Sequence, residues 1–102
     1  MPVTRSFSIP VGRLQSYDVE ASGVPLRVEA AFDAPVWLGW LDDASYTDLL
    51  AGASVAPLRA DVGDRFVYRV QLPAGRRLHL VAWNREGFVP LTGTVTLTGE
   101  GA

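Results

Sequence analysis

The chain has one histidine, His79, and no cysteine, which narrows the catalytic chemistry available to it. A catalytic histidine needs a nucleophile and an orienting acid within hydrogen-bond reach. Ser45 and Ser54 could supply a hydroxyl, but neither lies at the spacing of a nucleophile motif. The apolar pattern around His79 alternates, and it places the imidazole on the outer side of a strand. The sequence therefore predicts a solvent-facing histidine and no catalytic residue.

Acidic residues in the middle of the chain could supply the oxygen ligands that calcium prefers. They are Asp42, Asp43, Asp48, Asp61 and Asp64. Their spacing differs from the EF-hand loop, and helix capping and turn formation explain four of the five. Glu20 and Glu29 do not suit a glycosidase pair, because each alternates with core residues on a separate strand. We predict no metal, no cofactor and no enzymatic activity.

Three tryptophans are the residues most able to form a binding surface. Trp40 shares a strand face with Val36 and Leu38, which predicts a core position, whereas Trp37 and Trp83 fall on the opposite faces of their strands. Exposed tryptophans in a β-sandwich stack against sugar rings or anchor protein interfaces. A covering layer such as a helix would instead bury them. All three interpretations stay open at this point.

Length and composition set the class of protein. The 102 residues suit one domain spanning residues 1–102, and 48 % apolar residues suffice for one core. No apolar run is long enough to span a bilayer, and the first ten residues do not resemble a secretory signal. We therefore expect a cytoplasmic protein without a membrane partner. A net charge of −2 argues against binding to nucleic acid.

Alternating apolar and polar residues mark most of the chain as β-strand. Residues 36–41 are apolar on both faces, which predicts a strand that is covered on both sides or presents a contact surface. Asp42 or Asp43 can cap a helix of about two turns that carries Tyr46, Leu49 and Leu50 on one side. The prediction is an all-β protein: an antiparallel β-sandwich or jelly roll of seven or eight strands, with one short helix near residues 43–50.

Turn residues suggest how these strands connect. Residues 33–35 and 61–64 are predicted as turns, and residues 55–60 as a short edge strand weakened by Pro57. Residues 73–75 suit a three-residue hairpin loop. The expected hairpin pairs Val70 with Leu78 and Tyr68 with Leu80 on the core side.

A run in the middle of the chain resembles small bacterial accessory β-sandwich domains appended to peptidases or signalling domains. The residues that carry the resemblance are Val36, Leu38, Leu41, Asp42, Tyr46, Leu49 and Gly52, with the turn Pro73-Ala74-Gly75 before Leu78-His79-Leu80-Val81. The resemblance covers residues 26–83, and its motifs are structural. It implies a non-catalytic module that packs, binds or assembles.

Charge is segregated along the chain, with acids concentrated between residues 29 and 64 and arginines between residues 65 and 85. In the expected hairpin the arginines share an outer face with an aromatic side chain, which predicts a protein interface. Its candidate residues are Trp83, Arg65, Arg69, His79, Arg77 and Trp37. The predicted partner is another protein or a second, head-to-tail copy of this chain, giving a homo-oligomer. The alternative function is a carbohydrate-binding module that uses Trp37 and Trp83.

Overall fold

The computed structural model describes residues 2–85 and 87–99, which form six antiparallel β-strands and one α-helix. In chain order the elements are β1 (Val3–Ile9), β2 (Leu14–Glu20), β3 (Leu26–Asp42), α1 (Asp43–Leu50), β4 (Arg59–Val70), β5 (Arg77–Trp83) and β6 (Leu91–Gly99). The prediction of an all-β protein with one short helix is confirmed. The six strands form a curled sheet instead of a sandwich of seven or eight.

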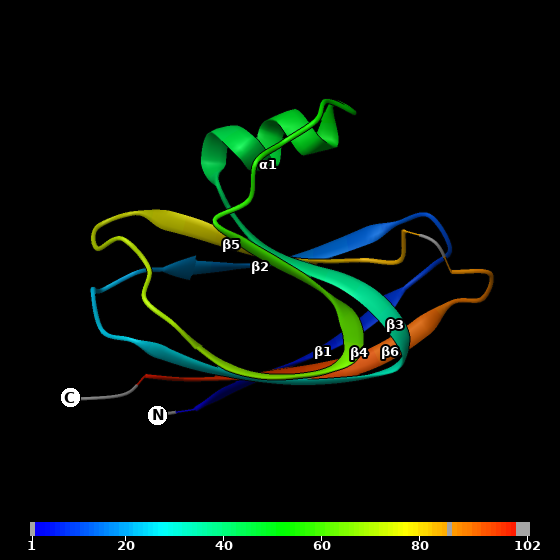
Figure 1. Cartoon of the computed structure of the whole chain (residues 1–102), viewed down its shortest axis with the longest axis horizontal. Helices are drawn as coiled ribbons and strands as arrows, with labels where there is room; N and C mark the ends of the chain where they lie inside the picture. Colours follow the sequence, from blue (N-terminus) through cyan, green and yellow to red (C-terminus); the bar gives the residue numbers. More distant parts are fainter. Residues whose placement is uncertain (1, 86, 100–102) are drawn as a thin grey trace.

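The 17-residue strand β3 organises this sheet. Residues 26–31 and 36–40 pair with β4 on one edge, and the other edge is shared between two strands. Residues Leu26–Phe32 pair with β6, and residues Trp37–Asp42 pair with β5. β1 then pairs with β6, and β2 pairs with β5. The pair β1 and β6 lies in one layer, and the pair β2 and β5 lies in the other. The sheet curls between these layers, so that β3 and β4 pass from one to the other (Figure 1).

β3 and β4 bend as they pass between the layers (Figure 1), and their register shifts between Ala31 and Val36. Residues 33–35 and 61–64 were predicted as turns, but both segments lie inside continuous strands. The residues on both sides of each segment are paired with neighbouring strands, which keeps the chain extended, so the turn-forming residues produce a bulge and a bend. The Asp33 carboxylate steadies the bend by accepting hydrogen bonds from the Thr92 amide and hydroxyl, at 3.0 and 3.3 Å.

The hydrophobic core fills the space between the two layers. Phe32 packs edge-to-face against Phe7 and Phe66, with ring centroids 6.2 and 6.4 Å apart. Trp40 is fully buried, as predicted, and its indole Nε1 donates to the Tyr68 hydroxyl at 3.0 Å. The indole therefore fills the core and satisfies its polar nitrogen at the same time.

The predicted pairing of β4 with β5 is wrong. The two strands lie on opposite edges of β3, so Val70 faces Leu26 and Tyr68 faces Val28. Alternation identifies the faces of a strand but does not identify its neighbour, and the long β3 separates these two strands. The short edge strand predicted at residues 55–60 does not form as such, because residues 55–58 are not in a strand and Arg59 and Ala60 begin the long strand β4.

Helix α1 begins and ends as predicted, and Asp42 is its N-cap. The helix lies over the outer face of β3 and β5 (Figure 1). Leu41 and Val81 point to this face and are fully buried, which confirms that the middle strand is covered on both sides. No helix in residues 2–85 and 87–99 is long and apolar enough to cross a membrane.

Candidate functional site

An apolar pocket lies at the bend of the sheet, beside residues 84–85 and 87–90 of the loop between β5 and β6. Its volume is about 430 Å³. The lining residues come from the bend in β3, from β4 and from the loop: Ala34, Pro35, Val36, Trp37, Val62, Asn84, Arg85, Gly87, Phe88 and Val89. We refer to it as the bend pocket. Its lining is mainly apolar, as is typical of binding sites.

Large apolar side chains around the bend pocket project into solvent. Phe88 is 97 % exposed, Val62 is 71 % exposed, and Val89 is also exposed. A single exposed apolar residue is ordinary on a protein surface, but a cluster around a pocket indicates an interaction site.

The base of the loop is fixed by Asn84, which is fully buried. Its side-chain Nδ2 donates to the carbonyl of Ile9 at 3.2 Å and to that of Val89 at 3.0 Å. Its backbone exchanges hydrogen bonds with Gly12 and Arg13 in the turn between β1 and β2. A Cβ atom at Gly87 would collide with the Asn84 side chain, so glycine is needed there. These contacts hold the segment that presents Phe88.

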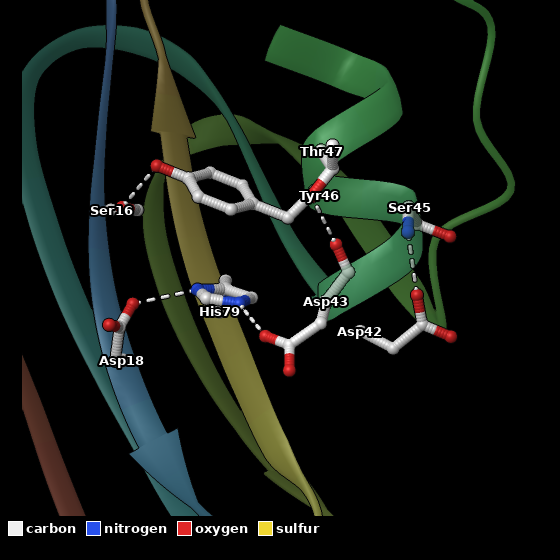
Figure 2. Close-up of polar contacts among 8 residues, drawn as sticks. All are labelled: Ser16, Asp18, Asp42, Asp43, Ser45, Tyr46, Thr47 and His79. Carbon is white, nitrogen blue, oxygen red and sulfur yellow. Dashed lines mark hydrogen bonds and ion pairs between the residues drawn. The ribbon is translucent and has the colours of Figure 1, made fainter.

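A second notable cluster surrounds His79, beneath helix α1 (Figure 2). His79 is only 6 % exposed, so the prediction of a solvent-facing histidine is wrong. The residue does point to the outer face of β5, but α1 covers that face. Tyr46 of the helix stacks on the imidazole, with centroids 4.2 Å apart and an interplanar angle of 17°.

Both ring nitrogens of His79 contact carboxylates. Nδ1 lies 2.7 Å from Asp18 Oδ1, and Nε2 lies 2.5 Å from Asp43 Oδ1. Ser16 bonds to the Tyr46 hydroxyl at 2.8 Å and not to the imidazole. His79 therefore links β2, β5 and α1, and no serine–histidine pair forms around it in the described residues.

The neighbouring Asp42 has a different task at the start of α1. Its carboxylate accepts a hydrogen bond from the Ser45 amide at 2.8 Å, and this bond lowers the pKa of Asp42 below its usual value of 3.8. Of the two adjacent aspartates, one thus caps the helix and the other binds His79. Within residues 2–85 and 87–99, no group of three or more His, Asp or Glu side chains is arranged to hold a metal ion.

The residues predicted to form one interface do not gather in one patch. Arg65 and Arg69 lie on β4, opposite Ala31 and Arg27 of β3. Arg77 begins β5, where it faces Glu20 of β2. The expected patch depended on pairing β4 with β5, and that pairing does not occur. A binding role for each of these residues stays a prediction.

Trp37 and Trp83 are the predicted site residues that the fold does bring together. They face each other across β3 and β5, with centroids 6.0 Å apart and rings at 81°. The Trp37 ring lies over Gly39, and the Arg85 guanidinium lies 5.2 Å from the Trp83 ring centroid. Both indoles are partly buried. Two perpendicular rings do not form the flat platform that a sugar ring stacks on.

Sequence reasoning missed the bend pocket, because residues 84–87 have the composition of an ordinary turn. The available signal was the apolar pair Phe88-Val89, which stands between that turn and Pro90.

No protein-family model matches the chain, and no curated protein sequence matches it. The solved structures with a similar fold include PirA and PliG, each at 14 % sequence identity. PirA aligns with a TM-score of 0.58 over 93 % of both chains. PliG of Aeromonas hydrophila, a periplasmic inhibitor of g-type lysozyme, aligns with a TM-score of 0.59 over 95 % of this chain and 86 % of its own.

These similarities establish a small all-β fold and correct one prediction. PliG is periplasmic, which contradicts the expectation of a cytoplasmic location. That expectation depended only on the absence of an obvious secretory signal from the sequence. The resemblance to accessory β-sandwich domains stays a prediction beyond the shared all-β character.

Proposed function

We propose that this protein is a non-catalytic binding module, and that the bend pocket receives an apolar side chain of a protein partner. The observation that carries the proposal is Phe88, which is 97 % exposed at the edge of an apolar pocket. Exposing a phenylalanine to water is unfavourable, and a partner that covers the ring would recover that free energy. The fold of PliG, an inhibitor of another protein, supports a protein as the partner.

The arrangement of the pocket favours an anchored interface. Asn84 holds the loop that carries Phe88 in place, so little conformational entropy is lost when a partner binds. Arg85 is the charged residue in the pocket lining among the described residues. A partner that combines an apolar anchor with a nearby carboxylate would satisfy both features.

Two other functions receive less support. Sugar binding would need an aromatic platform, but Trp37 and Trp83 are perpendicular, and Arg85 lies over the Trp83 ring. Catalysis by His79 would need a free ring nitrogen, but both nitrogens contact carboxylates. The proposed role is therefore binding without chemistry.

The test compares wild type with Phe88→Ala and with Leu50→Ala, a matched control on the exposed side of α1. The first purified probe is g-type lysozyme. Further candidate partners are captured from bacterial extracts, and the affinity of each is then measured with purified components. We expect Phe88→Ala to weaken binding at least about tenfold, as truncation of an interface anchor does, and Leu50→Ala to have no effect. A partner that binds wild type and Phe88→Ala equally well would refute the role of the pocket.

A further inference from the structure

The edge of β4 that faces away from β3 is an open strand edge. In the described part of the chain β4, a strand of 12 residues, pairs with β3 alone and lies in the foreground of the curled sheet (Figure 1). At the opposite side of the sheet, the edge of β1 is covered by a side chain. The Gln15 side chain accepts from the Ser8 amide at 3.0 Å and donates to the Ser6 carbonyl at 3.4 Å. Such coverage shields a strand edge from foreign strands, and β4 has no comparable side chain over it among the described residues.

We propose that two copies of this chain associate through their β4 edges, as antiparallel neighbours in one continuous sheet. The two-fold axis passes between Asp64 and Arg65. Each Asp64 then faces Arg65 of the partner subunit, which gives two symmetric ion pairs. Main-chain hydrogen bonds along the strands provide the general attraction in such an edge-to-edge contact, and the side chains select the register.

Exposed valines match in the same register. Val62 and Val67 are 71 and 69 % exposed, and Val62 of each subunit would face Val67 of the partner subunit. In a regular strand two positions five residues apart point to opposite faces. Here both valines lie on the outer face, because Val62 faces Trp37, Val67 faces Glu29, and the register shift at the bend intervenes. The irregularity of β4 thus makes its outer face self-complementary.

The neighbouring registers are unfavourable. A shift of one residue in one direction would place Asp64 opposite Asp64 of the partner subunit. A shift in the other direction would place Arg65 opposite Arg65 of the partner subunit. Like charges directly across two strands are destabilising, so this pair of residues discriminates between registers.

The curvature of the sheet is compatible with this symmetry. Both halves of β4 curl toward the core side of the bend (Figure 1). A two-fold axis perpendicular to the sheet at the bend superimposes this curvature on itself, so the second copy continues the same curl. The contact is isologous and closed, in contrast to the head-to-tail contact predicted from the sequence. This inference goes beyond the proposed function and does not depend on it.

A charge exchange tests the register by sedimentation velocity from about 1 to about 100 μM, where mass action populates a weak dimer. Wild type is expected to dimerise. Asp64→Arg places arginines opposite each other, and Arg65→Asp places aspartates opposite each other, so each single variant is expected to be monomeric. The double variant D64R/R65D restores opposite charges and the dimer. The Phe88→Ala variant is expected to leave the dimer unchanged, because the β4 contact shares Val62 with the bend pocket but does not include Phe88.

The absence of native cysteine allows a second test. The double variant V62C/V67C should form disulfide-linked dimers under mild oxidation. Within one strand the two positions are about 16 Å apart, too far for an intramolecular disulfide. Val67→Cys alone should form few dimers, because its partner position is a valine. A wild type that stays monomeric throughout, a dimer unaffected by the single charge changes, or equal cross-linking of the single and double cysteine variants would overturn the proposal.

Discussion

Replacement of His79 by alanine removes the side chain on which helix α1 rests. The imidazole is buried, Tyr46 stacks on it, and both of its nitrogens contact carboxylates. Tyr46 and Asp43 both belong to α1, so the substitution removes two contacts between the helix and the sheet at once. A helix of two turns is unstable by itself, and it therefore depends on such contacts.

The size of the effect follows from these contacts. Burial of a ring of this size contributes about 2 kcal/mol to the free energy of unfolding. The side chains of Asp18 and Asp43 are 56 and 69 % exposed, so water replaces much of each lost hydrogen bond. Each bond then contributes about 0.5 kcal/mol. The expected loss for His79→Ala is therefore about 3 kcal/mol in total.

Urea unfolding followed by tryptophan fluorescence measures this loss, and hydrogen exchange locates it. The helix amides should exchange faster in His79→Ala, whereas amides of β1 and β6, which lie far from the helix, should keep their relative protection. His79→Phe is the matched control, because it retains a ring for Tyr46 to stack on and loses only the hydrogen bonds, at about 1 kcal/mol. A loss below about 1 kcal/mol for His79→Ala, with unchanged helix exchange, would refute the anchoring role.

Two further predictions concern packing and pH. Gly39→Ala should destabilise the protein by about 1–3 kcal/mol and alter its tryptophan fluorescence, because the added Cβ would lie 2.5 Å from Cη2 of Trp37. Gly99→Ala, where the Cβ meets no atom within 4 Å, is the control in thermal unfolding. Burial raises the pKa of Tyr68 above its usual value of 10.0, so the folded state retains this proton more strongly than the unfolded state. Stability from this group is complete below pH 10.0 and falls as the pH rises through the higher, folded-state pKa. Unfolding measured from pH 8 upward should show a steeper alkaline decline in wild type than in Tyr68→Phe, and equal declines would contradict the assignment.

The sequence by itself determined the local features of the fold. A period of two identifies the face that each strand buries, and it correctly placed Trp40 in the core. The helix at residues 43–50 was predictable because its N-cap, Asp42, and the glycine after its end, Gly52, are neighbours in the chain. Apolar residues on both faces of the middle strand also predicted a second covering layer. These are short-range signals, and they need no knowledge of which segments meet.

Only the tertiary structure decided which segments lie side by side. Alternation gives the same pattern whether β5 neighbours β4 or β3, so the sequence offered no means to exclude the wrong hairpin. The burial of His79 was not predicted for the same reason. Its side chain points outward as predicted, but helix α1, which lies 29 or more residues earlier in the chain, covers that face. The bend pocket also depends on long-range pairing, because it exists only where β5 and β6 share one edge of β3 and the loop between them projects at the bend. Strand order and coverage are set by the lowest free energy of the whole chain, and no local pattern contains that information.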